Sequence, residues 1–496
     1  MLRHSRVIGI GIFFFWLVVT GLYVYQQDRP SSIDPAERQL PTEASDTWMG
    51  ISVASGDGGE AIPIGYANYR TTPGVREGDS GVAYALTMRM DTQIFAQRTQ
   101  LDLTGSAWVT QKDGLKQFQF RMHSGGQHAV AATGVVENKR LQIAVDTGGE
   151  TFPLAFPIRS DLIVRGGLGT TTLNLPALEI GDTVTVDAFD PMTLSYGKAY
   201  VTCLDTETIQ IRGEPVLTKV LETELAGLKS RTWVTPEEEV VRIESPLGFI
   251  LEVTSREDAI SDFEGKRGGE TLLSTLAVRP EGKRPFRGAR RMRFRLSQLP
   301  PDTAPPADAN QRETEPGVYE IVVPRTPAAD TMTDPELIDY LGDDPFIHTG
   351  HPKIRSQAEA IVAESVSDWQ RASALQDWVF ENIRKQSVLS FPSALEVLES
   401  RTGDCNEHTV LFTAMSRTVG IPTRVAVGLV WSDDLAAFYY HAWPEVYMNE
   451  WIPLEPTLGQ TVADATHIKL LEGSVEEWPR LAPYLGQIQI EVLDVE

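Results

Sequence analysis

The spacing of apolar residues changes partway along this chain, and that change limits the folds open to it. Over 62–296 apolar and polar residues alternate, as they do at 118–122, which predicts half-buried antiparallel strands. Five prolines then fall within 299–316, a composition typical of extended backbone between domains. From 354 onward the apolar residues recur at helical spacing. The sequence therefore predicts an α+β protein in which an antiparallel β-rich part precedes a mixed part.

The length also indicates more than one domain, because 496 residues exceed what a single hydrophobic core usually organises. A short helix is expected at 222–228, inside the β-rich part. We expect five segments: a cytoplasmic stub and transmembrane anchor at 1–27, a flexible tether at 28–60, the β-rich antiparallel domain at 61–298, a Pro-rich linker at 299–317 and a mixed α+β domain at 318–496.

An uncharged run of nineteen residues, Val7–Tyr25, lies near the amino terminus. A helix needs about 20 apolar residues to cross a bilayer, so this run predicts a single transmembrane helix. Arg3 and Arg6 precede it and Asp28 follows, which places the amino end in the cytoplasm and the bulk of the chain outside. The run is longer than a signal-peptide core and no small-x-small cleavage site follows it, which favours an uncleaved anchor. We expect a bacterial inner-membrane protein whose bulk is periplasmic.

The charge and the cysteines exclude several functions. With 68 acidic and 44 basic residues the net charge is −24, so the surface repels a phosphate backbone and no nucleic-acid partner is expected. Two cysteines are too few for a disulfide framework or a thiolate cluster, and no metal or cofactor is expected. Cys203 lies in an apolar run and fits a buried structural thiol. The basic cluster at 283–295 ends in a period-two pattern that predicts a strand with a solvated basic face; docking of an acidic partner, or of the acidic remainder of this molecule, is the alternative.

The second cysteine opens a predicted helix. Asp404 is a favourable N-cap, and Glu407 three residues later completes a pattern similar to a capping box, so Cys405 falls at the first helical position. There the thiol faces unsatisfied backbone N–H groups and the positive end of the helix dipole, which favour the thiolate. The same N–H groups could hold an oxyanion on an attacked carbonyl. The position is that of an activated nucleophile.

A nucleophilic thiol needs a base and an orienting group, and candidates for both follow on predicted strands. His441 lies inside the strand expected at 438–448, and Glu455 comes directly after the strand expected at 451–454. A hairpin between these strands would fold the carboxylate back beside the imidazole. The spacing therefore allows a triad of Cys405, His441 and Glu455.

Together these segments resemble the transglutaminase-like superfamily, the papain-related thiol fold that includes transglutaminases and bacterial peptidases and amidases. The resemblance covers about 335–471 and rests on GDCNEH at 403–408, GIPTR at 420–424 followed by VG at 427–428, HAWPEV at 441–446 and WIPLEPT at 451–457. It implies that Cys405 is the nucleophile and His441 the base, with Glu455 where the family usually has Asp. Asp464 is the second choice for that carboxylate, and the segment at 466–468, which contains His467, also resembles the family.

The resemblance implies acyl transfer through a thioester on Cys405. Water would release the acyl group, as in a cysteine peptidase or amidase, whereas an amine would give a transglutaminase cross-link. Hydrolysis is favoured because bulk water outcompetes amines unless a site excludes it. The expected substrate is a protein or peptide of the cell envelope.

The alternative is a non-catalytic module that binds protein or peptidoglycan. In strand pattern alone, the β-rich domain weakly resembles the open half-barrels of periplasmic lipoprotein-carrier proteins. Trp443, on the His441 face of its strand, either packs in the core or stacks on substrate, and we take it as the candidate substrate-binding residue. His408, one turn after Cys405, fits a packing role better than a metal site because no further ligand pair completes a set of four.

Overall fold

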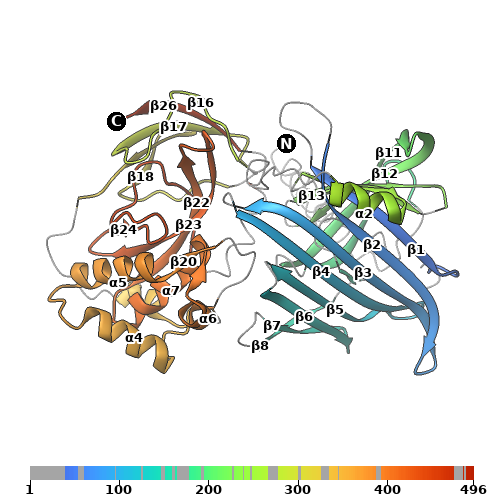
Figure 1. Ribbon diagram of the computed structural model, residues 1–496, viewed down its shortest axis with the longest axis horizontal. Coiled ribbons are helices and arrows are strands. Elements are labelled where there is room, and N and C mark those ends of the chain that lie inside the picture. Colours follow the sequence, from blue (N-terminus) through green and yellow to red (C-terminus); the bar gives the residue numbers. More distant parts are fainter. Residues whose placement is uncertain are drawn as a thin grey trace, which may run out of the picture.

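The computed structural model describes residues 40–496 with the exception of 54–60, 95–96, 125–126, 147–150, 159–161, 165–177, 191–194, 226–227, 238, 246–247, 266–276, 300–302, 326–334, 345, 387–392, 474–483 and 485–487. The described elements form two bodies, one almost entirely β and one mixed (Figure 1). None of the described helices has both the length and the apolar character that crossing a membrane requires. The anchor predicted at Val7–Tyr25 lies outside these residues.

The first body is a single 15-stranded sheet. From edge to edge its order is β8 (Thr151–Pro157), β7 (Arg140–Asp146), β6 (Gln127–Glu137), β5 (Gly114–Ser124), β4 (Gln97–Thr110), β3 (Asp79–Ile94), β2 (Ile62–Arg76), β1 (Ser45–Val53), β15 (Phe249–Thr254), β14 (Val240–Glu244), β13 (Leu228–Val234), β12 (Glu214–Leu225), β11 (Ser195–Ile211), β10 (Thr183–Asp190) and β9 (Leu162–Val164). Neighbouring strands are antiparallel except β9, which runs parallel to β10. This confirms the β-rich antiparallel first part.

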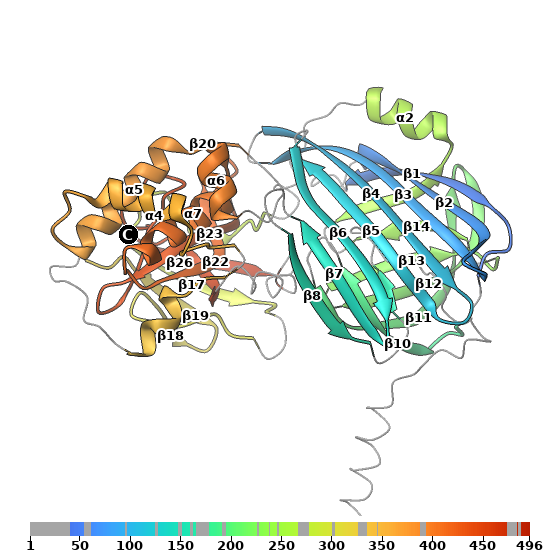
Figure 2. The same cartoon turned by 90° about the horizontal axis from the view of Figure 1, so that it is seen from below.

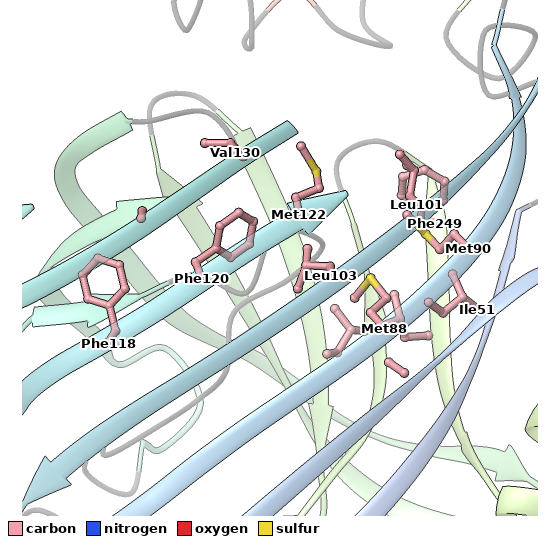
Figure 3. Close-up of a cluster of buried hydrophobic side chains, with 14 of the residues drawn as sticks. Ile51, Met88, Met90, Leu101, Leu103, Phe118, Phe120, Met122, Val130 and Phe249 are labelled. Atoms are coloured by element: carbon pink, nitrogen blue, oxygen red, sulfur yellow. The ribbon is translucent and has the colours of Figure 1, made fainter. Parts of the chain in front are cut away.

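The sheet curls so that one half faces the other (Figure 2). Alternate residues of each strand point into a shared apolar core, as Phe118, Phe120 and Met122 do in β5 (Figure 3). The Phe118 ring lies 5.6 Å from that of Phe189 in β10, on the other limb of the sheet. On the opposite face α2 (Arg256–Gly265) packs on β1 and β2 through Phe263.

Two predictions for this region are wrong. Residues 45–53 of the predicted tether form β1, which joins β2 to β15 because Met49, Ile51 and Val53 alternate into the core. The helix expected at 222–228 is also wrong, since residues 222–225 continue β12. There Glu222 pairs with Arg231 of β13, which the isolated sequence does not reveal.

The second body has three layers, with a four-stranded sheet in the middle (Figure 1). The middle sheet contains β24 (Trp451–Pro453), β23 (Ala437–Tyr447), β22 (Thr423–Ser432) and β25 (Ile468–Gly473). One face is covered by η2 (Pro335–Leu341), α4 (Pro352–Val362), α5 (Asp368–Asn382), α6 (Ala394–Ser400) and α7 (Cys405–Thr418), beside the short pair β20 (Arg384–Lys385) and β21 (Thr402–Gly403). The other face packs against a five-stranded sheet of β16 (Glu281–Gly282), β26 (Gln489–Val495), β17 (Arg291–Ser297), β19 (Val318–Val322) and β18 (Gln311–Glu315).

The two bodies divide earlier in the chain than the predicted linker at 299–317. β17 pairs with β19 and β26, and Val278 already bridges to Phe438 of the middle sheet. β18 lies largely inside the predicted linker. Residues from Val278 onward therefore belong with the second body by their pairing, although the predicted boundary assigned those up to 298 to the first.

The basic strand predicted near 291–296 is present as β17, and its arginine side chains are partly exposed while also pairing with carboxylates. Arg291 lies 2.7 Å from Glu320, Arg293 lies 2.6 Å from Glu315, and Arg295 pairs with Glu491 of β26. These partners lie on neighbouring strands of the same sheet or in the turn beside it. The acidic remainder of the molecule thus meets this basic face.

Candidate active site

α7 carries Cys405 at its first position, as predicted. The Asn406 N–H donates to the Asp404 carboxylate at 3.0 Å, and the Asp404 N–H donates to Glu407 at 2.7 Å, so the capping box is complete. Gly403 is needed here because a Cβ at that position would lie 2.1 Å from the Glu407 Cβ. Cys405 is therefore fixed at the helix start, with 6% of its surface exposed.

The thiol is held neutral, which corrects the predicted thiolate. Burial raises the pKa of Cys405 well above its usual value and the Asp404 and Glu407 carboxylates raise it further, against a lowering by the Ala442 N–H. Burial is the main cause of the difference, and the cap adds to it because first-turn N–H groups donate to Asp404 and its charge offsets the helix dipole. The sulfur consequently needs a base that takes its proton as it attacks.

β23 brings that base to the sulfur. The Ala442 N–H reaches the Cys405 sulfur, and the Ala442 carbonyl accepts from Thr409 Oγ1 of α7 at 3.1 Å. His441 directly precedes Ala442 in β23, and no hydrogen bond joins the described side chains of Cys405 and His441. Its Nε2 lies 2.7 Å from Glu455 Oε2, and its buried Nδ1 has no hydrogen-bond partner among the described residues. Because Glu455 accepts a hydrogen bond from Nε2, Nδ1 is the ring atom that carries the lone pair in a neutral His441.

Glu455 is fully buried, and both of its carboxylate oxygens accept hydrogen bonds. Its Oε1 accepts the N–H groups of Thr457 and Leu458 at 2.9 and 3.0 Å. Burial alone would raise the carboxyl pKa, but His441 and His467 hold the pKa of Glu455 well below its usual range. The Glu455 side chain, one methylene longer than Asp, therefore makes the hydrogen bond to His441.

A second histidine shares Glu455, and sequence reasoning gave it no role. His467 Nε2 lies 2.8 Å from Glu455 Oε2, and its Nδ1 lies 3.0 Å from the Asp464 carbonyl oxygen. Asp464, the second choice for the orienting carboxylate, thus contacts His467 and not His441. The only sequence signal for His467 was the likeness of 466–468 to a family segment. Nothing in the sequence indicated its pairing with Glu455.

Trp443 is 1% exposed, which corrects its assignment to substrate stacking. Its ring stacks on His441 with centroids 6.2 Å apart and meets His467 edge-on at 5.2 Å, so it packs within the site. Tyr439 stands edge-on to His441 on the same face of β23. His408 has the packing role predicted for it: its Nδ1 lies 2.6 Å from the Asp404 carbonyl, and burial lowers its pKa to about 4.

Two groups of described residues place three donors within reach of one cation: His441, Glu455 and His467, and Asp308, Glu445 and Glu472. In the first group both Nε2 atoms are directed at one oxygen of Glu455 through hydrogen bonds. In the second, Lys469 lies 3.0 Å from both Glu445 and Glu472 and also contacts Asp308, while Arg424 contacts the same three carboxylates. Hydrogen bonds hold the first group together, and the Lys469 and Arg424 cations neutralise the second. We therefore assign neither group as a metal centre.

The layered second body, with a cysteine at a helix start and a histidine on the adjoining sheet, defines a papain-like thiol-enzyme arrangement. Residues 355–456 match the transglutaminase-like superfamily, so this chain carries a domain of that superfamily.

Two solved structures match parts of the chain. One is a candidate cysteine protease from Cytophaga hutchinsonii, with 14% identity and a TM-score of 0.28 over 42% of this chain and 86% of that one. The other is a candidate protease from Parabacteroides distasonis, with 11% identity and a TM-score of 0.21 over 69% of this chain and 64% of that one. Among curated proteins, none matches the sequence.

Proposed function

We propose that this protein hydrolyses peptide or amide bonds by thiol acyl transfer through Cys405, His441 and Glu455. His441 Nδ1 takes the thiol proton as the sulfur attacks a carbonyl carbon, and the same proton passes to the leaving amine when the C–N bond breaks. Water then attacks the thioester, its proton goes to His441, and the sulfur leaves and regains that proton. Glu455 stabilises the imidazolium at each stage.

The observation that supports this proposal most is the hydrogen bonding of the two His441 ring nitrogens. One nitrogen is bound to a buried carboxylate and the other has no partner among the described side chains and backbone groups, next to the strand residue whose N–H meets the sulfur. His408 also has a buried Nε2 without a partner among the described residues, but its other nitrogen meets a backbone carbonyl, whereas that of His441 meets a carboxylate. A free buried nitrogen suits a group that must accept a proton.

The first test needs no substrate. In the full chain, iodoacetamide labelling followed by mass spectrometry compares Cys405 with Cys203, which is fully buried in the β-rich body. We expect faster labelling of Cys405, and we expect His441→Ala to remove that advantage. Equal, slow labelling of both cysteines would contradict the proposal and favour a non-catalytic binding module.

The second test separates hydrolysis from cross-linking. Release of ammonia and of new amino termini from a glutamine-rich protein such as casein is followed with and without a labelled primary amine. Hydrolysis predicts release that the added amine leaves unchanged, and Cys405→Ala abolishes it. Cys203→Ala, the matched replacement of the other cysteine, retains it. Incorporation of the labelled amine into the protein, with ammonia still released and no new amino termini, would instead identify an amine transferase.

We further propose that Val7–Tyr25 anchors the chain in the inner membrane, with both bodies in the periplasm acting on envelope proteins or peptides. The uncharged run and the preceding arginines support this. The chain should then resist carbonate extraction from membranes and be digested by protease added to spheroplasts. Recovery in the soluble cytoplasmic fraction would contradict it.

A further inference from the structure

We infer that His467 and Asp464 form a positioning pair of the active site, in which His467 carries a proton on both ring nitrogens and holds Glu455 in place for His441. This inference rests on the proposed function and extends it beyond the three residues of the triad. It concerns residues that lie outside the segment matching the superfamily.

The protonation of His467 follows from its hydrogen bonds. A backbone carbonyl can only accept, so the contact of Nδ1 with the Asp464 carbonyl at 3.0 Å requires a proton on Nδ1. The ionised Glu455 can only accept as well, so the contact of Nε2 with Oε2 at 2.8 Å requires a proton on Nε2. Both nitrogens therefore donate, and the ring is an imidazolium. The Asp464 carboxylate, 3.3 Å from Nδ1, balances its charge.

The surroundings of His467 favour that charge. Burial would lower the pKa of His467, yet Asp464 and Glu455 raise it above the ordinary value. The titratable or charged groups that face the pair are Glu455 after β24, His441 and Tyr439 on β23, and Arg287 from the segment between β16 and β17. The negative charges of Glu455 and Asp464 balance the positive charges of His467 and Arg287, so Glu455 keeps its own charge to stabilise an imidazolium that forms on His441 during acyl transfer.

The pair is anchored by the segment between β16 and β17. The Gly288 N–H donates to Asp464 Oδ2 at 2.8 Å, and Arg287 Nε lies 3.4 Å from the same oxygen. The Ala465 N–H donates to the Ala289 carbonyl at 2.8 Å. Arg287 and Gly288, about 120 positions before Cys405, thus hold Asp464 in place. Asp464 in turn positions His467, and His467 positions Glu455.

A fixed imidazolium predicts a specific response to pH. As the pH rises through the folded pKa of His467, one ring proton is lost and a nitrogen lone pair faces either a carbonyl or a carboxylate. Glu455 is then no longer held from this side, so activity should fall at alkaline pH. Glutamine at position 467 can still donate to Glu455 and has no proton to lose in this range.

The experiment compares His467→Gln with His467→Leu in the full chain, because the two side chains are similar in volume and differ in donating a hydrogen bond. His123→Gln in β5 is the matched control in the other body. We expect roughly a tenfold to hundredfold loss of hydrolysis in His467→Leu and a smaller loss in His467→Gln. The alkaline fall of the wild type should be absent in His467→Gln. Equal losses in the two variants with an unchanged pH profile would overturn the inference.

A readout independent of activity keeps this inference distinct from the proposed function. In protein labelled with ¹⁵N-histidine, the wild type should show one imidazolium at pH 7 with two ring protons protected from exchange, and the signal should be lost in His467→Gln. A neutral His467 overturns the inference even if the enzyme is active. An imidazolium in a protein without thiol reactivity would instead refute the proposed function alone.

Discussion

The sulfur of Cys405 lies at a helix start whose cap is negatively charged. Asp404 and Glu407 satisfy first-turn N–H groups, and the same carboxylates raise the pKa of the thiol after burial has already raised it. The cap therefore stabilises the helix while disfavouring the thiolate form of Cys405. On the proposed function, the reactivity of the Cys405 thiol should therefore depend on His441 and not only on how exposed the sulfur is.

Replacing Asp404 by Asn tests the role of the cap's charge. Asn is an equally good N-cap, so the helix start should persist, while removal of the charge lowers the pKa of Cys405. We expect the rate of alkylation by iodoacetamide at pH 7 to rise by roughly threefold to tenfold. Asp377→Asn, an exposed Asp-to-Asn change on α5 of the same body, serves as control. A slower reaction with an intact fold would contradict the assigned role of the charge.

His408 gives a stability prediction with a defined sign. Its pKa is lowered from 6.5 to about 4, so its neutral form contributes stability above about pH 6.5, and that contribution is lost as the pH falls toward 4. Between about pH 7 and about pH 4.5 the wild type should lose roughly 2 kcal/mol through this residue. His408→Gln, which cannot titrate, should lose that much less in urea unfolding at the two pH values. Identical losses would show that His408 is already charged or exposed.

Among the elements, the contact of β22 with β25 determines where His467 lies. A Cβ on Gly428 would lie 1.9 Å from the Ile468 carbonyl oxygen, so the two backbones meet at a distance that only glycine permits. Ile468 directly follows His467. The glycine in β22 therefore sets the depth at which the second histidine meets Glu455.

Gly428→Ala should accordingly cost about 1–3 kcal/mol or more in the free energy of unfolding and reduce activity as His467 is displaced. Gly197→Ala in β11 is the matched control, because a Cβ there would meet only Leu225 Cδ1 at 3.6 Å. Urea unfolding and hydrolysis rates check both effects. If the two variants were equally stable, the close approach would not be the constraint described.

Elements whose signals are local in the chain could be predicted from the sequence, and those set by distant pairing could not. The start of α7 and the ranges of β23 and β24 lie close to their predictions because capping residues and apolar runs mark them. Glu455 was found through its short separation from His441. The bond of Asp464 to Gly288 spans 176 positions, and no local pattern marks such a contact. The same reason explains why β17 was assigned to the first body.

At the scale of the whole molecule, the second body needs residues that precede the predicted linker. Phe294 of β17 belongs to the same apolar core as Leu429 and Phe438 of the middle sheet. Without that strand one face of the middle sheet would lose part of its cover. The second body therefore extends well beyond the segment that matches the superfamily.

Two fragments check this division. Residues 277–496 should fold into a soluble unit with protease-resistant termini. The fragment 318–496, cut at the predicted boundary, should expose apolar surface because β16, β17 and β18 are missing. Binding of a hydrophobic dye and limited proteolysis distinguish the two. Equal stability of both fragments would show that the five-stranded sheet is dispensable.

The position of β26 between β16 and β17 governs when the site can be completed during synthesis. Lys283 and Asp494 pair across 211 positions, so the sheet behind Gly288 stays unformed until the ribosome has passed the codons for 489–495. A nascent chain can already display the thiol and both histidines while Asp464 lacks its backbone donor. On the proposed function, a chain that stops before β26 should therefore show less acyl transfer than the full chain.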